Sequence, residues 1–341
     1  MDKDDSFTQV FNFENERQPL GARVLLKHVA LLLLTFVTVT IASTLYPFGS
    51  EGMFAESDPQ TWTELFYFFL LLPGQYVLTI FSAVQKIFTD AATLAHALSF
   101  SLSLLFILIC HEMGHYIACR IYRVEATLPF FIPTPPMIGP AGTFGAFIKI
   151  LSPMPSRKAV FDIGVAGPIA GFIALLPIAV IGILTAKPAP PDVLANYSGI
   201  TFSDPILMQI IAALAGVDLS ASYCNAFFYA AWIGLLVTAL NLIPSGQLDG
   251  GHAIYAVLGK RVHYWTGRVA FVVMAALSIL GLVYFNSPSG FLIAILLGIM
   301  MRIPHPEPWD DSPLDLKRKL VAAAVPAIFA LSFLPFPIKI T

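Results

Sequence analysis

Long apolar segments separated by short polar ones run along most of the chain. A transmembrane helix needs about 20 mostly apolar residues. Segments that approach this length cover residues 27–47, 93–118, 160–186, 224–243, 267–285, 288–302 and 320–337. The pattern predicts an all-α polytopic membrane protein with about seven transmembrane helices.

Two further apolar segments are ambiguous. Residues 65–84 contain Pro73 and Gly74, so this segment could form a span, a re-entrant pair or an interfacial helix. Residues 205–217 are shorter than a typical span, and whether they cross stays open. Lys and Arg concentrate in cytoplasmic loops. Those of this chain fall on one side if the N-terminus is cytoplasmic and 65–84 does not fully cross, so we favour seven crossings.

Composition supports a membrane protein and argues against other classes. Hydrophobic residues make up 57% of the chain and charged residues 12%, whereas soluble domains average about 25% charged residues. The net charge of −2 and the lack of a basic patch give no sign of a nucleic-acid partner. The acidic, polar N-terminus has the features of neither a signal peptide nor a transit peptide. This fits a bacterial inner (cell) membrane, with an organelle membrane as the open alternative, and the Lys and Arg distribution places the N-terminus in the cytoplasm.

One predicted span carries the pentapeptide HEMGH at residues 111–115, which has the spacing HExxH. Positions i and i+4 of a helix share a face, so His111 and His115 can direct their imidazoles at one metal ion. Glu112 lies beside them and can take a proton from a water at that metal. Such groups are costly at membrane depth, which marks them as functional candidates. Arg120 lies nine residues after His111 and marks the cytoplasmic end of the helix. At a rise of 1.5 Å per residue, the metal is expected roughly 14 Å inside that end.

A later segment, residues 241–252, reads NLIPSGQLDGGH. Its proline and glycines break the helix, and irregular backbone at membrane depth is tolerated only where it lines protein or a water-filled cavity. Asp249 on such a bend can reach a neighbouring helix. With His111 and His115 it makes three protein ligands, and the fourth position of a zinc ion stays open, as in catalytic zinc sites.

HExxH in one span and N-x-x-P-x-x-x-x-D-G in a later one resemble the site-2 protease family of intramembrane zinc metalloproteases. The segment FDIGVAGPIAGF, residues 161–172, and the loop at 130–150 are similar to the bacterial and chloroplast branch of that family, which lacks a PDZ domain. The resemblance covers about residues 92–260. It implies a zinc-dependent endopeptidase that cuts membrane proteins within or near their transmembrane segments.

The resemblance also implies a role for each site residue. His111, His115 and Asp249 match the ligands of one zinc ion per chain. Glu112 matches the general base that activates water. Asn241 matches an asparagine that helps to hold the substrate or the oxyanion, and an interhelical hydrogen bond is its alternative interpretation.

The segments group into four regions. They are a cytoplasmic polar tail (1–26), a first transmembrane helix with an outer or re-entrant segment (27–91), a catalytic intramembrane core (92–260) and C-terminal transmembrane helices (261–341) with a cytoplasmic loop at 303–319. Residues 142–149 alternate and contain glycine, which predicts a short strand or hairpin. In the resembling family such an element is membrane-associated and lies near the active site, where an extended substrate could pair with its edge.

Some interpretations stay open. Cys119 continues the i, i+4 row from His115, so a thiolate ligand is conceivable, although a buried inert thiol fits better. His252 either orients a ligand or water, or solvates the end of its helix. The alternative function is a non-catalytic zinc-binding membrane protein, either a pseudoprotease or a transporter. Transmembrane protein substrates and the lipid bilayer are the expected partners, and the oligomeric state is unknown.

Overall fold

The computed structural model describes residues 21–49, 60–190, 199–303 and 305–340. Most of the predicted cytoplasmic tail therefore lies outside the described residues. Within these ranges, five helices are long and apolar enough to cross a membrane. They are α2 (Ala22–Ala42), α3 (Trp62–Thr89), α4 (Ala91–Ile121), α5 (Arg157–Leu184) and α10 (Lys260–Phe285).

Five shorter helices complete the helical part of the described chain, which is mostly helical. They are α7 (Ile206–Ala215), α8 (Ala226–Leu242), α9 (Asp249–Leu258), α11 (Gly290–Met300) and α12 (Leu316–Ser332). The predicted count of seven spans is therefore not confirmed. The predicted span at 288–302 contains only the 11 residues of α11, which extend about 16 Å, roughly half of a bilayer core.

The structure also excludes one of the three interpretations of residues 65–84, the re-entrant pair. The segment lies inside the continuous 28-residue helix α3, which runs through Pro73 without a break. A re-entrant pair is therefore wrong for this segment. Proline is tolerated in membrane helices because neighbouring groups can satisfy the freed carbonyl, so the proline is a weaker break signal here than in a soluble helix.

Side-chain caps fix the starts of the three central helices. Asp90 accepts hydrogen bonds from the backbone at the start of α4, Ser156 does so for α5, and Asn225 for α8. Each satisfies backbone N–H groups that have no partner within the helix. In a membrane protein such groups are costly when unpaired, so these polar residues define where the helices begin.

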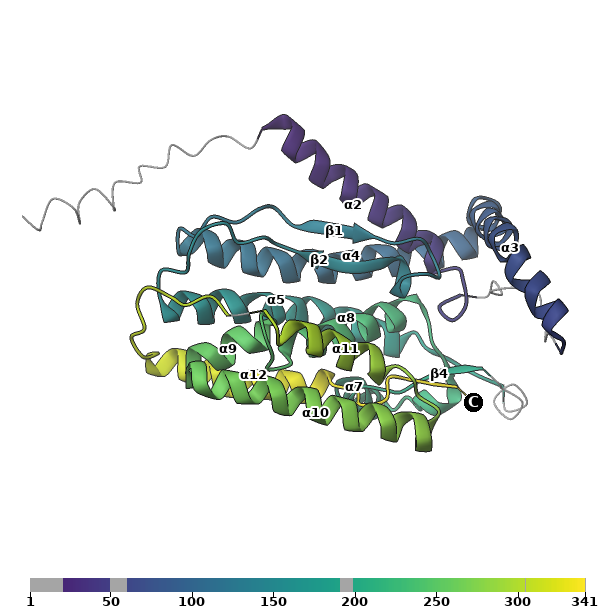
Figure 1. Cartoon of the computed structure of the whole chain (residues 1–341). Helices are drawn as coiled ribbons and strands as arrows, with labels where there is room; N and C mark the ends of the chain where they lie inside the picture. Colours follow the sequence, from purple (N-terminus) through teal and green to yellow (C-terminus); the bar gives the residue numbers. More distant parts are fainter. Residues whose placement is uncertain (1–20, 50–59, 191–198, 304, 341) are drawn as a thin grey trace, which may run out of the picture.

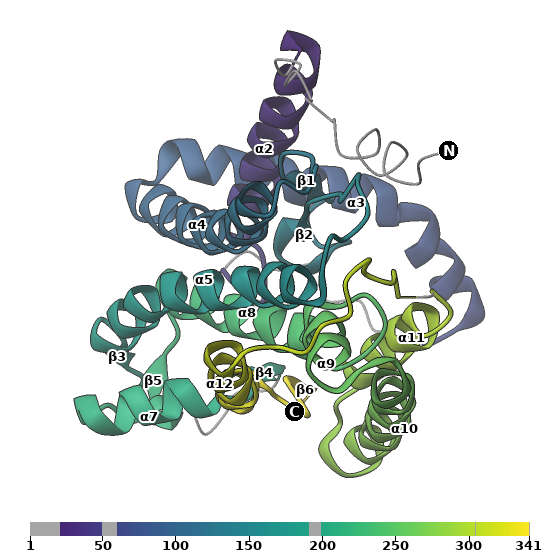
Figure 2. The same cartoon turned by 90° about the vertical axis from the view of Figure 1, so that its left-hand side faces the viewer.

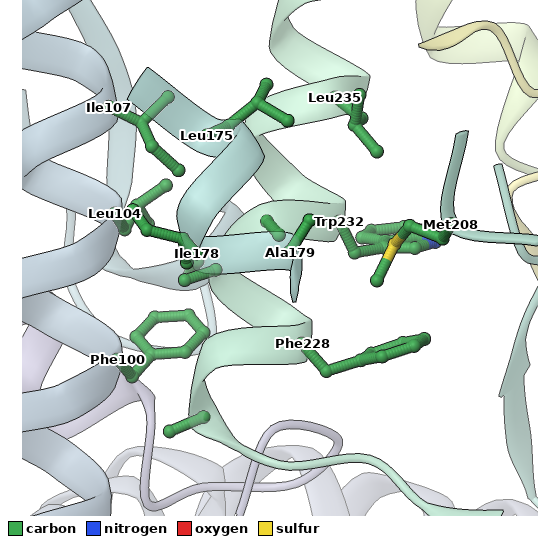
Figure 3. Packing of buried hydrophobic residues seen from close by; sticks show 14 of the residues in the cluster. Phe100, Leu104, Ile107, Leu175, Ile178, Ala179, Met208, Phe228, Trp232 and Leu235 are labelled. Atoms are coloured by element: carbon green, nitrogen blue, oxygen red, sulfur yellow. The ribbon is translucent and has the colours of Figure 1, made fainter. Parts of the chain in front are cut away.

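The central helices α4, α5 and α8 lie side by side, with α2 on one side of them and α10 and α12 on the other (Figures 1 and 2). Their facing side chains interdigitate. Figure 3 shows Phe100 and Leu104 of α4 directed toward Ile178 of α5, while Trp232 of α8 lies beside Met208 of α7. Between membrane helices such contacts stabilise by close van der Waals packing, because lipid is as apolar as the side chains.

A pair of short antiparallel strands, β1 (Phe130–Pro133) and β2 (Thr143–Phe147), lies between α2 and the centre. A 3-10 turn, Pro140–Gly142, precedes β2. Thr38 of α2 donates to the Gly142 carbonyl at 2.8 Å. A Cβ on Gly142 would lie 2.4 Å from a backbone oxygen of α2, and its φ of +79° also requires glycine. The helix α2 is thus held against the strand pair.

Two more strand pairs were not predicted. β3 (Lys187–Pro188) pairs with β5 (Ser222–Tyr223), which follows the 3-10 turn Leu219–Ala221, and β4 (Ile200–Phe202) pairs with β6 (Ile338–Ile340). These strands are two or three residues long, too short for an alternating pattern to be read from sequence.

Candidate metal centre

Helix α4 places His111, Glu112 and His115 in the interior, where all three side chains are buried. The two histidine rings meet edge to face, with centroids 5.0 Å apart and an angle of 69° between their planes. Gly114 lies on the side of α4 that meets α5. A Cβ on Gly114 would lie 2.4 Å from the Ala166 carbonyl oxygen, so the two helices approach this closely because the residue is glycine.

Asp249 is the first residue of α9, which begins shortly after α8 ends at Leu242. Gly250 permits this arrangement. A Cβ on Gly250 would lie 2.1 Å from the Leu242 carbonyl oxygen, too close for any other residue type. The Asp-Gly sequence therefore lets α9 start against the end of α8, and this start brings the Asp249 carboxylate to α4.

Three ligand atoms form a nearly equilateral triangle. Oδ2 of Asp249 lies 3.3 Å from Nε2 of His111 and 3.3 Å from Nε2 of His115, and the two nitrogens are 3.2 Å apart. Ligand atoms about 2.0–2.2 Å from a tetrahedral zinc ion are roughly 3.3–3.6 Å from one another. The donor set therefore fits such an ion. We call these residues the metal triad, and among the described residues no other group of three potential ligands is this close.

Helix α5 sets the orientation of His115. Nδ1 of His115 donates to the Ile163 carbonyl at 2.7 Å. A neutral imidazole with its proton on Nδ1 has its lone pair on Nε2, the atom that faces the triad. Gly167, one turn further along α5, leaves the space for the ring, because a Cβ there would lie 2.0 Å from Nε2 of His115.

Two polar side chains border the triad. The Glu112 carboxylate belongs to the pocket lining that also includes Ile148, just after β2. Nδ2 of Asn241, near the end of α8, lies 3.2 Å from Nε2 of His111. A carboxylate and an amide thus stand next to the position that a metal ion would occupy.

The triad opens into a pocket of about 550 Å³. The pocket wall is formed by α4, by the end of β2 and the segment after it, by the start of α5 and by the α8–α9 junction. Besides the triad, its lining includes Glu112, Ala146, Phe147, Ile148, Asn241, Gln247, His252 and Pro306. A peptide lying along the end of β2 would therefore reach the triad.

The structure brings together all the residues that the sequence singled out for this site. They are His111, Glu112, His115, Asn241 and Asp249. Cys119 is buried and lines neither the triad nor the pocket. The sequence did not indicate the Ile163 carbonyl, because a backbone group leaves no mark in a side-chain pattern.

Comparisons with known proteins point to the same chemistry. The profile of the family described as Peptidase family M50 matches residues 99–282, which contain the whole triad. The chain is similar to the probable zinc metalloprotease EGY1, chloroplastic, of Oryza sativa subsp. japonica, with 28% identity over 247 residues, 71% of this chain and 41% of that protein. The EGY1 protein of Arabidopsis thaliana is 28% identical over 254 residues, 73% of this chain and 44% of that protein. The chain thus spans less than half the length of these relatives.

Proposed function

The chain belongs to peptidase family M50, and from that premise we propose that it is a zinc-dependent endopeptidase that hydrolyses peptide bonds within or near transmembrane segments of membrane proteins. The observation that carries the proposal is the metal triad with Glu112 beside it. Two histidines and one carboxylate hold one zinc ion per chain and leave a fourth position for water or substrate, as catalytic zinc sites do.

The side chains around the triad then have separate roles. When bound, zinc polarises the scissile carbonyl and makes a water reactive at neutral pH. Glu112 takes the proton from that water and passes it to the leaving amine. Asn241 donates an amide hydrogen bond to the oxyanion, which is worth about 3 kcal/mol when well aimed. Ile163 holds His115 in the tautomer that the ligand role requires.

We propose that the substrate binds as an extended strand beside β2, and that the β1–β2 pair lies at membrane depth. β1 pairs with one edge of β2, and residues at the end of β2 line the pocket. Main-chain hydrogen bonds along a strand edge accept many sequences. Such pairing would also unwind a helical substrate, which must happen before its peptide bonds can be attacked.

We propose a bacterial cell membrane as the location, with a cytoplasmic N-terminus. The relatives reported above are named as chloroplastic proteins, and the proposed orientation of this chain rests on the distribution of Lys and Arg. The arrangement in Figure 1 supports it, because α4, α5, α10 and α12 run along one common direction. The starts of α5, α10 and α12 would lie on the cytoplasmic side.

The substitution Glu112→Gln tests the catalytic proposal. The purified chain in proteoliposomes is mixed with single-span membrane proteins tagged at both ends, and cleavage is followed on gels. Glutamine keeps the side-chain shape and removes the base, so cleavage falls by at least about 100-fold while zinc stays near one per chain. Glu125→Gln, at an exposed position, is the matched control. Unchanged cleavage in Glu112→Gln would contradict the mechanism, and a wild type that binds zinc without cleaving would favour the non-catalytic alternative.

The substitution Phe147→Pro tests strand pairing. Proline removes the backbone N–H of the strand, so cleavage is abolished while zinc remains bound. Phe147→Ala keeps the N–H and is the control for loss of the side chain. Ile148→Pro is expected to act in the same way. Persistent cleavage in Phe147→Pro would show that the substrate does not pair with β2.

A further inference from the structure

Three histidines outside the metal triad form a second cluster. His252 of α9 has its Nδ1 atom 2.7 Å from Nε2 of His305, which lies in the loop after α11. The His305 ring stacks on Tyr255 with a centroid distance of 4.0 Å and an angle of 8°. His263 of α10 has its ring 5.1 Å from that of His305. We call His252, His263 and His305 the histidine trio.

The hydrogen bonds of His305 determine which nitrogen of His252 carries the proton. Nδ1 of His305 lies 2.8 Å from the Pro306 carbonyl oxygen, and a carbonyl only accepts, so this nitrogen donates. Nε2 of a neutral His305 is then an acceptor, and Nδ1 of His252 must donate to it. The other nitrogen of His252, Nε2, therefore carries a lone pair.

Both histidines are neutral at physiological pH. Burial lowers the pKa of His252 to about 4 and the pKa of His305 to about 3, and the neighbouring histidines lower both further. The carboxylate of Asp249 acts in the opposite direction on His252 without offsetting the burial. The assigned tautomer is therefore the form that the protein holds near pH 7.

His252 belongs to the wall of the pocket that contains the metal triad. Within the described residues the imidazole of His252 makes one hydrogen bond, through Nδ1. Gly164 of α5 leaves room for the side chain, because a Cβ on Gly164 would lie 2.7 Å from Cβ of His252. The pocket thus has an unused neutral acceptor on the part of its wall that α9 forms.

We propose that His305 is a positioning residue that holds His252 in this tautomer, and that Nε2 of His252 accepts a hydrogen bond from a backbone N–H of the bound substrate. This deepens the proposed function and rests on it. A strand paired with β2 directs about half of its N–H groups away from β2. At membrane depth each of those groups needs an acceptor, and His252 supplies one from a different wall of the pocket.

Kinetics of cleavage separate this role from a structural one. His252→Ala removes the acceptor, and His305→Ala no longer holds His252 in the tautomer that accepts through Nε2. Each variant therefore raises KM up to roughly fivefold, which corresponds to the loss of one neutral hydrogen bond. The value of kcat stays within about twofold of wild type and zinc content is unchanged. His305→Gln restores KM, because its amide oxygen can accept from Nδ1 of His252. Glu307 lies in the same loop as His305 and forms an exposed ion pair with Lys260 of α10. Glu307→Gln breaks this pair and leaves KM unchanged.

Two kinetic results and one change in zinc content would overturn the proposal. A fall in kcat with unchanged KM would place His252 in the chemical step. Equal effects of His305→Ala and His305→Gln would mean that His305 only packs the loop. Loss of zinc from either variant would mean that the histidine trio supports the metal.

A second readout does not depend on turnover. Nitrogen NMR of the full chain with 15N-labelled histidine rings, in detergent micelles, is expected to show His252 protonated at Nδ1 and unprotonated at Nε2. His305→Ala mixes the two tautomers and Glu307→Gln does not. In Glu112→Gln, addition of an uncleaved substrate peptide shifts the His252 Nε2 signal. Protonation at Nε2 in wild type, or no shift with bound peptide, would overturn the inference, whereas absence of cleavage by zinc-loaded wild type would overturn the proposed function instead.

Discussion

The metal triad and the histidine trio lie at the same pocket and are built differently. In the triad, two histidine nitrogens and a carboxylate oxygen converge within 3.3 Å of one another. In the trio, the closest pair is a donor matched with an acceptor, Nδ1 of His252 with Nε2 of His305. Converging lone pairs repel one another unless a metal ion or a proton lies between them, so the triad is arranged to hold a metal ion, whereas the pair in the trio is already matched. The arrangement of lone pairs, more than the number of histidines, distinguishes the two clusters.

Backbone carbonyls set this difference. The Ile163 carbonyl takes the Nδ1 proton of His115 and leaves Nε2 for a metal. The Pro306 carbonyl takes the Nδ1 proton of His305 in the same way, but there the free Nε2 meets an N–H. The Gly246 carbonyl accepts from Nε2 of His263 at 2.9 Å, which leaves that nitrogen unable to bind a metal.

The largest expected effect separates the clusters directly. Asp249→Ala removes one of three ligands, so zinc affinity falls by more than the roughly 10–100-fold that loss of an outer partner costs. His263→Ala removes a histidine that is outside the triad and leaves zinc near one per chain. Elemental analysis of the purified variants measures both. Zinc loss in both variants would contradict the division into two clusters.

Gly167→Ala is expected to lower the zinc affinity by a smaller factor than Asp249→Ala does. The added Cβ would lie 2.0 Å from Nε2 of His115, so the ring must move and zinc affinity falls roughly 10–100-fold. Gly74→Ala in α3 is the matched control, because its Cβ would meet no atom within 4 Å. A chelator titration of both variants measures the affinities, and equal values would show that α5 does not position the triad.

The ion pairs next to the two clusters should contribute differently to the stability of the fold. Asp162, next to Ile163, accepts from Arg318 at 2.7 Å, and both side chains are about three-quarters buried. Asp162→Asn is expected to lower the free energy of unfolding by about 2 kcal/mol, because it removes the more buried of the two carboxylates that pair with Arg318. Glu307→Gln, in the exposed pair beside the trio, is expected to leave the thermal midpoint unchanged. Equal midpoints for the two variants would contradict this ranking.

The smallest effect is a pH dependence of stability that comes from the trio. Unfolded histidines bind a proton below about pH 6.5, whereas folded His252 and His305 stay neutral down to about pH 4 and 3. Between these values the unfolded state binds more protons, so stability falls as the pH falls. At pH 5.5 the loss is about 1 kcal/mol for each histidine. Thermal unfolding of metal-free protein at pH 7.0 and 5.5 should show a smaller loss in the double variant His252→Gln with His305→Gln, and an equal loss would contradict the assignment.

The sequence predicted the site better than it predicted the membrane topology. The i, i+4 spacing of His111 and His115 and the Asp-Gly break at Asp249 are local signals, and the triad joins them as expected. Span counting relies on the length of apolar segments. That length does not show that residues 288–302 form only an 11-residue helix, or that α3 continues through Pro73.

The sequence could not predict the groups that orient the site. His305 lies in an irregular loop, and nothing in its spacing relates it to His252, 53 residues earlier. Ile163 acts through its backbone, and its apolar side chain only indicates a membrane segment. These contacts depend on how the helices pack, which is a tertiary property.

X-ray absorption at the zinc edge of the zinc-loaded chain tests the central claim most directly, because it counts the atoms bound to the metal. The account predicts two imidazole nitrogens at about 2.0–2.1 Å, with the remaining ligands being oxygen at about 2.0–2.2 Å. A bound sulfur at about 2.3 Å or a third imidazole would contradict it. Sulfur would indicate a cysteine such as Cys119, and a third imidazole would indicate that the histidine trio shares the metal.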